Sequence, residues 1–259
     1  MNISNGIKLV LLSGLVCLGA MGCEDDGSQD SSAVTSVVES TPLVTENKIL
    51  FVHGINIPDW AEDWIEQYMG PEWIDDEAEQ KMDNFCDQLE YYMGVDVYRV
   101  SLPRDLAYNG TNAYHAQVIK DFIDNEMDLQ PGEKIDIVAH SMGGLSARYY
   151  LKELGGDDKV DDYISLDTPQ RGISWIKWYW WTVADLSPGS NLFQTLNGDP
   201  DDDVDECPGN TNYAAFFADY NAGSYLNCGE VNYEFFGLPH MDFLTDILVL
   251  STAINILRN

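Results

Sequence analysis

The chain has 259 residues, 45% of them hydrophobic, which is enough length and apolar content for one substantial buried core. Its 44 acidic residues outnumber its 13 basic residues, giving a formal net charge of −31. This balance excludes nucleic acid as a partner, because such binding needs a basic surface. An anionic membrane surface would also repel the chain, so any lipid contact must be apolar or covalent.

The first 22 residues read as an export signal. Lys8 precedes an apolar run of 12 residues, LVLLSGLVCLGA, which is too short to span a bilayer stably. Small residues then lead to Cys23 in AMGCED, which resembles a bacterial lipoprotein signal. On this interpretation Cys23 becomes the lipid-modified first residue and anchors the protein to a membrane. Plain secretory cleavage is the alternative, and both interpretations place the protein outside the cytoplasm, in the cell envelope or secreted.

Residues 23–47 are polar, rich in Ser and Thr, and without periodicity, which predicts a flexible linker. The folded domain is therefore expected over residues 48–259. Two of its three cysteines, Cys207 and Cys228, flank a loop-rich stretch and are expected to pair in an oxidising compartment. The third, Cys86, lies in a helical pattern and is expected to be a buried thiol.

In chain order the domain alternates between strand and helix patterns. Short apolar or alternating runs predict strands, and apolar residues at helical spacing predict helices. Strands are expected at 48–54, 95–102, 134–140, 159–167 and 211–219, and helices at 79–93, 113–127, 143–154 and 242–257. This order predicts an α/β fold with a parallel sheet that is covered by helices on both faces. Ligands bind such sheets at the carboxyl ends of the strands.

One strand end carries the pattern AHSMG at residues 139–143, the G-x-S-x-G nucleophile elbow with alanine in the first place. A serine on a tight strand-to-helix turn is pushed out of the sheet, and the residues two before and two after it must be small. Ala139 and Gly143 meet this need. The following helix directs backbone N–H groups toward developing negative charge. Ser141 is therefore the candidate nucleophile.

A serine hydroxyl needs a base, and His240 is the one histidine that follows Ser141 in the chain. This order, serine before histidine, is that of the α/β-hydrolase triad. A tetrahedral intermediate also needs two N–H donors. The backbone amides of Met142, next to the nucleophile, and of Ile55, after the strand ending in FVHG, are the candidates for this oxyanion hole.

Three segments, KILFVHGI, IDIVAHSMGGLSARYYLKEL and VDDYISLDTPQRG, resemble those of secreted bacterial triacylglycerol lipases of the α/β-hydrolase superfamily. LSPGSNLFQTLN, at 186–197, is also similar to a segment of that group. The resemblance covers most of residues 48–257. It implies an α/β-hydrolase fold with a mostly parallel central sheet, Ser141 as nucleophile, and His240 as base.

The resemblance leaves the catalytic acid open. In these lipases an aspartate follows the strand read here as YAAFFADYN, where Asn221 stands at the matching place and Asp219 lies two residues earlier. Asp219 is the first choice, because an asparagine cannot stabilise the imidazolium by charge. Asp167 in LDTP is the alternative, since some animal lipases carry their acid at the end of the preceding strand.

Tryptophans gather in two predicted insertions, near 57–78 and 173–185. Trp175, Trp178 and Trp181, with Trp180, follow the strand that ends at Asp167, while Trp60, Trp64 and Trp73 follow the predicted oxyanion strand. Indole rings favour the boundary between water and lipid, so we expect these segments to form a lid or walls for an acyl chain. Buried core packing is the simpler interpretation of the same residues.

The stretch NGDPDDDVDEC places Asp199, Asp201, Asp203 and Asp205 at alternate positions. Calcium prefers several oxygens on a flexible loop, but the glycine and terminal glutamate of an EF-hand are missing. We interpret this stretch as a solvated acidic loop and predict neither a metal nor a cofactor.

These observations predict a carboxylic ester hydrolase, foremost a lipase, that acts on an ester or lipid substrate through a Ser-His-Asp triad and an acyl-enzyme. An acyltransferase, or an esterase for polyesters or wall-bound acyl groups, would use the same residues. A non-catalytic binding protein with the same fold is the alternative from a different class.

Overall fold

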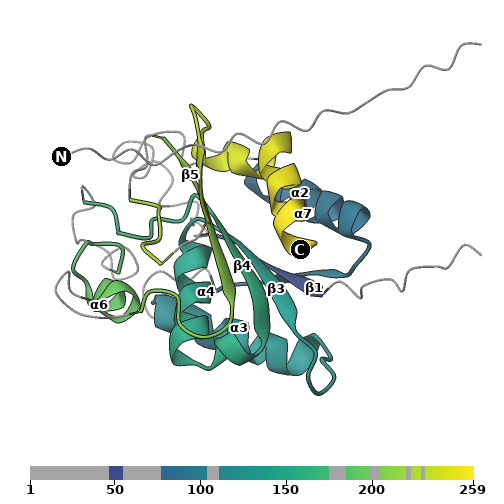
Figure 1. The fold of residues 1–259 in the computed structure, drawn as a ribbon, viewed down its shortest axis with the longest axis horizontal. Coiled ribbons are helices and arrows are strands. Elements are labelled where there is room, and N and C mark those ends of the chain that lie inside the picture. Colours follow the sequence, from purple (N-terminus) through teal and green to yellow (C-terminus); the bar gives the residue numbers. More distant parts are fainter. Residues whose placement is uncertain are drawn as a thin grey trace, which may run out of the picture. The chain divides into compact units, whose positions relative to one another are not determined.

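A parallel sheet forms the centre of the structure (Figure 1). The structure is a computed structural model, and it describes residues 47–54, 77–103, 111–174, 185–198, 205–219, 223–228 and 231–259. Within these ranges the sheet has six strands in the order β2-β1-β3-β4-β5-β6, and every neighbouring pair is parallel. The strands are β1 (Lys48–Val52), β2 (Val97–Val100), β3 (Ile135–His140), β4 (Val160–Leu166), β5 (Asn212–Ala218) and β6 (Val231–Phe235).

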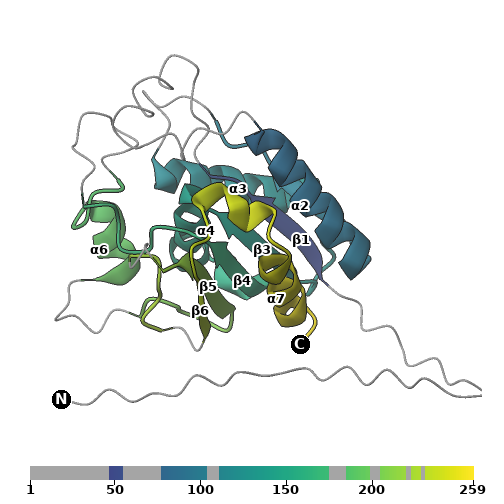
Figure 2. The same ribbon diagram turned by 90° about the horizontal axis from the view of Figure 1, so that it is seen from above.

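Helices cover both faces of this sheet. The α-helices are α2 (Ala78–Met93), α3 (Asn112–Glu126), α4 (Met142–Glu153), α6 (Asn191–Asn197) and α7 (Ile247–Leu257), and the short 3-10 helices are η2 (Gly156–Asp158) and η3 (His240–Leu244). Helices α3 and α4 pack side by side on one face, and α2 and α7 lie on the other (Figures 1 and 2). The predicted parallel sheet with two helical layers is confirmed.

Strand β1 shows why the sheet is covered on both sides. Successive side chains of a strand point to opposite faces. Ile49 and Phe51 belong to the apolar cluster that contains residues of α2 and α7, whereas Leu50 and Val52 belong to the cluster with α3 and α4. All four are buried, so a continuous apolar run is what this central strand requires.

The predicted elements are confirmed with small shifts at their ends, except near the C-terminus. The helix expected over 242–257 is divided into η3 and α7. Asp246 causes the division, because its carboxylate accepts hydrogen bonds from the N–H groups of Leu248 and Val249 and so caps a new helix. Helix α6 and strand β6 were not predicted. β6 is a short edge strand that depends on pairing with β5.

A buried arginine ties α4 to the segments beside it. Arg148 is 1% exposed, and its guanidinium donates to the side-chain oxygens of Gln170 and Asn197 and to the carbonyls of Leu196 and Glu206, at 2.9 to 3.2 Å. Burial lowers its pKa. The charge is thus solvated by protein oxygens, and these contacts join α4 to α6 and to the loop at 205–207.

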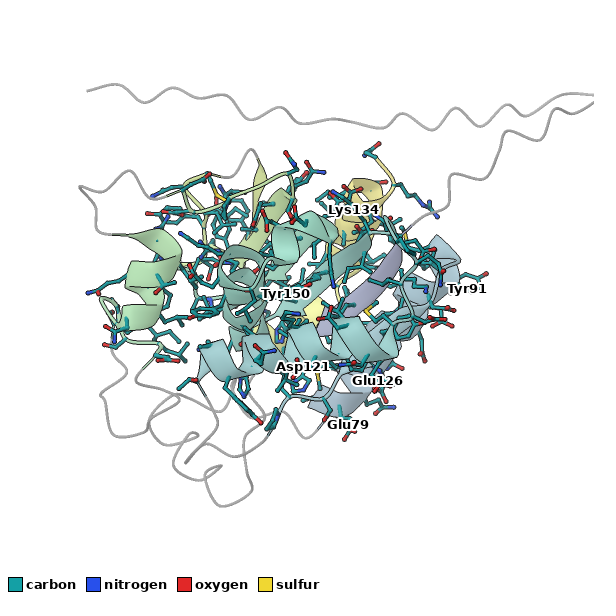
Figure 3. The ribbon with its side chains drawn as sticks, turned by 90° about the horizontal axis from the view of Figure 1, so that it is seen from below. Glu79, Tyr91, Asp121, Glu126, Lys134 and Tyr150 are labelled. Atoms are coloured by element: carbon teal, nitrogen blue, oxygen red, sulfur yellow. A yellow bond between two sulfur atoms is a disulfide. The ribbon has the colours of Figure 1, made fainter. Side chains whose placement is uncertain are left out.

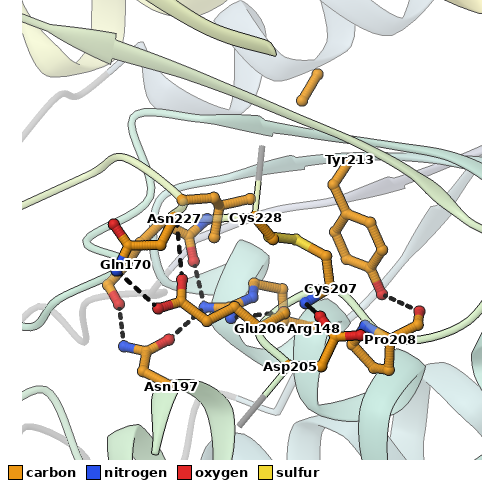
Figure 4. Close-up of a disulfide and its surroundings, with 12 residues drawn as sticks. Arg148, Gln170, Asn197, Asp205, Glu206, Cys207, Pro208, Tyr213, Asn227 and Cys228 are labelled. Atoms are coloured by element: carbon orange, nitrogen blue, oxygen red, sulfur yellow. Dashed lines mark hydrogen bonds between the residues drawn. A yellow bond between two sulfur atoms is a disulfide. The ribbon is translucent and has the colours of Figure 1, made fainter. Parts of the chain in front are cut away.

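A disulfide lies beside this arginine (Figure 4). Cys207 and Cys228 are bonded, as predicted. The side chain of Glu206 forms a two-pronged ion pair with Arg171 and also accepts hydrogen bonds from Asn227. These contacts attach the segments at 205–207 and 227–228 to the loop that follows β4. Cys86, the third cysteine of the domain, is free and buried, also as predicted.

Acidic side chains line the outer surface of the helices. Glu79 on α2 and Asp121 and Glu126 on α3 are exposed, and Figure 3 shows them on the outside of the helical layers, with Tyr150 among the inner side chains. These carboxylates face solvent and contribute to the negative net charge of the chain. No helix in the described part of the chain is long and apolar enough to cross a bilayer.

A buried carboxyl group lies near the amino end of β3. Asp136 is 1% exposed, and one of its oxygens accepts hydrogen bonds from the Asn47 side chain and from the N–H of Asp162. Burial raises its pKa to about 7 despite these donors, and the neighbouring Asp162 and Asp161 carboxylates add to the rise. Its ionised form is therefore disfavoured in the folded protein.

Replacing both bonded cysteines, in C207S/C228S, is expected to lower the free energy of unfolding. The bridge joins residues 21 positions apart, and a loop of this size contributes about 3 kcal/mol. Urea unfolding of the oxidised parent and the variant measures the difference. The C86S variant is the control for loss of a thiol outside the bridge. Equal urea midpoints for the parent and for C207S/C228S would contradict the prediction.

The D136N variant is expected to be more stable than the parent above pH 7. The pKa of Asp136 in the folded protein lies above the unfolded value of 3.8. The contribution of this carboxyl group to the free energy of unfolding is therefore complete below pH 3.8 and is lost as the pH rises through about 7. Asparagine keeps an oxygen to accept both hydrogen bonds and carries no charge. Thermal unfolding across this pH range should show a weaker decline for D136N than for the parent, while the exposed-site control D87N follows the parent.

Candidate active site

Three side chains meet at the carboxyl edge of the sheet. Ser141 follows β3, Asp167 follows the neighbouring strand β4, and His240 begins η3 after β6. His240 Nε2 lies 3.0 Å from Ser141 Oγ, and His240 Nδ1 lies 2.6 Å from Asp167 Oδ2. All three are at least 95% buried. Segments as much as 99 positions apart therefore form one continuous chain of hydrogen bonds.

Ser141 has the backbone of a nucleophile elbow. Its φ of 57° and ψ of −136° are rarely adopted by a residue with a side chain and cost about 1–3 kcal/mol. The surrounding structure holds this conformation. Ser141 N–H donates to the carbonyl of Leu166 at 2.9 Å, and the Thr168 hydroxyl donates to the carbonyl of Ser141 at 2.8 Å. The serine is therefore fixed between the ends of β3 and β4.

Two glycines allow the strand and helix to approach at this turn. A Cβ atom on Gly143 would lie 2.2 Å from the carbonyl oxygen of His53, and one on Gly54 would lie 2.6 Å from Ser141 Cβ. Real Cβ atoms do not approach other atoms so closely, so only glycine fits without movement of the backbone. This confirms the expected need for a small residue at position 143. The matching need at position 54 was not predicted.

The carboxylate beside the histidine is that of Asp167, whereas Asp219, the first choice for the acid, contacts Gly237 instead. Asp167 Oδ1 accepts a hydrogen bond from Ala218 N–H at 3.3 Å, which leaves Oδ2 directed at His240. Strand β4 is the direct neighbour of β3, so its end lies next to the serine, whereas β5 is one strand further away. Asp219 instead accepts a hydrogen bond from Gly237 N–H at 2.8 Å and so holds the turn that leads to His240.

The α4 helix begins at Met142, directly after the serine. The first N–H groups of a helix have no acceptor within the helix, so the Met142 amide is available to an oxyanion. The second predicted donor, Ile55, lies outside the described residues. Its neighbour His53 is described: Nε2 accepts from Leu102 N–H at 3.1 Å, and Nδ1 therefore donates to the carbonyl of Gly54 at 2.7 Å.

Several predicted residues fall outside the described ranges. These are the lipidation site Cys23, the tryptophans Trp175, Trp178 and Trp181 with the other insertion tryptophans, and Asp199, Asp201 and Asp203 of the acidic loop. Their assignments stay predictions. In contrast, the supporting contacts of Thr168 and Gly54 were missed, because no pattern in the sequence marks a residue that packs against the elbow from another strand.

One group of carboxylates in the described part of the chain has the spacing of a metal site, and it lies away from the triad. Asp136, Asp161 and Asp162 sit near the amino ends of β3 and β4. Their oxygens accept hydrogen bonds from the side chains of Asn47, Lys134 and Asn212. Ser141, His240 and Asp167 bring together a hydroxyl, an imidazole and a carboxylate in an arrangement that can activate a serine as a nucleophile.

Comparisons with known proteins agree with this geometry. A family model described as palmitoyl protein thioesterase matches residues 48–227, a range that contains Ser141 and Asp167. Among solved structures the chain is similar to lipase B of Aspergillus fumigatus, with a TM-score of 0.58 and 12% identity over 83% of this chain and 53% of that chain. The chain thus spans about half the length of that lipase.

Two further solved structures cover most of both chains. The mature lipase BlEst2 of Bacillus licheniformis has a TM-score of 0.53 and 16% identity over 84% of this chain and 94% of that one. The product of the gene lin2722 of Listeria innocua has a TM-score of 0.52 and 10% identity over 80% and 92%. These likenesses establish that the fold is that of the α/β-hydrolases.

The two aspartates can be separated by their effect on the reactivity of Ser141. D167N is expected to slow the reaction of the serine with a fluorophosphonate probe by about three to four orders of magnitude, because asparagine cannot stabilise the imidazolium by charge. D219N keeps an oxygen for Gly237 and should change the rate by less than about tenfold. Rates of covalent labelling followed by mass spectrometry measure both, and a larger loss in D219N than in D167N would refute the assignment.

Proposed function

The chain belongs to the palmitoyl protein thioesterase family, and from this premise we propose that it hydrolyses fatty acyl esters and thioesters through an acyl-enzyme formed on Ser141. The family and the fold make it a serine ester hydrolase. The proposal adds the residues, the intermediate and the class of acyl substrate. Its main support is the hydrogen-bond chain from Asp167 through His240 to Ser141.

In the first half of the reaction, Ser141 Oγ attacks the carbonyl carbon while its proton passes to His240 Nε2. The imidazolium that results keeps its other proton on Nδ1, directed at the Asp167 carboxylate 2.6 Å away. The carbonyl oxygen becomes an anion and is stabilised by the Met142 amide and, as predicted, by that of Ile55. The bond to the leaving oxygen or sulfur then breaks, and His240 returns the proton to the leaving group.

In the second half, water takes the place of the leaving group. His240 removes a proton from water, the hydroxide adds to the acyl carbon, and the bond to Ser141 Oγ breaks as the serine regains its proton. The products are a fatty acid and an alcohol or thiol. Every step uses groups of this chain and water, so the mechanism needs no added cofactor.

An apolar acyl chain is favoured by the side chains beside the elbow. Met142 and Leu145 on α4 form a buried cluster with residues of the neighbouring segments: Ile173, Leu186, Leu192, Phe193 and Leu196. Residues 173 and 186 border the predicted insertion that carries Trp175, Trp178 and Trp181. We assign the wall of the acyl site to this insertion, because its described flanks, Ile173 and Leu186, belong to the same apolar cluster as the start of the helix that follows Ser141.

Export of the protein belongs to the same proposal. The bonded pair Cys207 and Cys228 is suited to an oxidising compartment outside the cytoplasm. This agrees with a signal over residues 1–22, a linker over 23–47 and lipid attachment at Cys23. The acidic domain would then act on acyl groups in the cell envelope or its surroundings while held to the membrane by its anchor.

The proposed chemistry is tested with p-nitrophenyl esters and acyl thioesters of increasing chain length. We expect hydrolysis of both, faster for long chains than for acetyl, and accumulation of a covalent acyl group on Ser141. S141A should reduce the rate by at least about a thousandfold, because the nucleophile is lost. S146A removes another serine of α4, which bonds to Asn112, and should retain parent activity.

Three outcomes would refute parts of this proposal. Parent-like rates for S141A would exclude the serine mechanism. Hydrolysis limited to short acyl chains would exclude the fatty acyl substrate. Transfer of the acyl group to an added alcohol in preference to water would identify an acyltransferase instead.

A further inference from the structure

His140 has a contact that its place in the sequence does not explain. It is the last residue of β3 and is 3% exposed. Its Nε2 lies 3.1 Å from the backbone carbonyl oxygen of His240, and the two rings lie 4.7 Å apart between centroids at an angle of 37°. The residue before the nucleophile thus touches the base, 100 positions away in the chain.

The carbonyl oxygen of His240 determines which nitrogen of the His140 imidazole carries the proton. A carbonyl oxygen only accepts, so His140 must carry its proton on Nε2. The pKa of His140 is lowered to about 3, chiefly by burial and next by the charge of His240, while the hydrogen bond to the His240 backbone and the Asp167 carboxylate act in the opposite sense. His53 is the other titratable group that faces it. His140 therefore stays neutral and keeps its proton on Nε2 wherever His240 can act as a base.

This neutrality matters to the reaction. When His240 takes the proton of Ser141 it becomes a cation, and a second cation 4.7 Å from its ring would oppose that step. A neutral imidazole gives His240 a hydrogen bond without this repulsion. A lysine or arginine at position 140 would offer a donor as well, but only with a charge.

The contact also complements that of Asp167. Asp167 contacts the His240 ring through Nδ1, and that contact does not act on the backbone of η3. His140 holds the backbone carbonyl of the same residue, and it does so from the strand that carries the nucleophile. His140 and Leu166 are paired in register, so the contacts that His140 and Asp167 make with His240 arise at adjacent strand ends.

We infer that His140 is a positioning residue for the reaction proposed above: its Nε2–H holds the His240 backbone at the distance from Ser141 that proton transfer requires. Its action passes through His240, and it does not touch the reacting atoms. The inference rests on the proposed function but is separable from it, since the position of His240 can be observed without substrate.

The test compares variants that remove the donor with one that keeps it. H140F and H140M lack a donor, whereas the amide of H140Q offers an N–H at nearly the same reach as Nε2. H115Q is the matched control, because His115 is also a buried histidine but lies on α3 outside the triad. Two quantities are measured: kcat and KM with a p-nitrophenyl ester, and the low-field proton resonance of His240 Nδ1–H in the enzyme without substrate.

We expect H140F and H140M to lower kcat by about tenfold to hundredfold, the loss caused by a misplacement of about 1 Å, with KM changed far less. Their His240 resonance should shift or broaden. H140Q should recover most of kcat and the parent resonance, and H115Q should match the parent in both measurements.

The inference is overturned if H140F or H140M, folded as judged by thermal unfolding, keeps the parent kcat and resonance. It is also overturned if H140Q is as slow as H140F. Should neither donor-free variant fold, H140Q decides alone: parent-like kcat supports the inference, and a tenfold loss or more overturns it. Activity retained in S141A would refute the proposed function, while the His240 resonance would still test the role of His140.

Discussion

The hydrogen bond between His240 Nδ1 and Asp167 Oδ2 is the contact on which the site depends. It determines which nitrogen of His240 faces Ser141, and in the proposed reaction it places a negative charge beside the imidazolium. The bond exists because β4 lies beside β3 in the sheet, so that the residues after these two strands are neighbours. The order of strands thus places Asp167 rather than Asp219 beside His240, since β5 ends one strand further from Ser141.

Much of the structure around this bond serves to hold strained or buried groups in place. Ser141 and Asp167 both have a positive φ, and each is fixed by a backbone hydrogen bond to the adjacent strand or its end. Asp219 contributes in the same way, by holding the turn before His240. On the far side of α4, Arg148 and the disulfide attach the neighbouring loops to the helix that starts at the nucleophile.

The histidines show that tertiary contacts decide the surroundings and the role of a residue. The chain has four, and only His240 had an expected chemical role. His140 and His115 lie outside the predicted triad. The structure buries both, and His53 links the ends of β1 and β2 through Gly54 and Leu102. Three of the four thus gather at the carboxyl edge of the sheet through contacts between segments distant in sequence.

The sequence by itself determined the features that depend on local pattern. Apolar runs and helical spacing define most strands and helices, and the small residues around Ser141 identify the elbow, because both follow from neighbours within a few positions. The placement of Asp167 rather than Asp219 beside His240, the contact of His140 with His240 and the pairing of β6 were decided only by the tertiary structure. Each depends on which strand ends lie side by side, a property of the whole sheet that no local stretch of residues specifies.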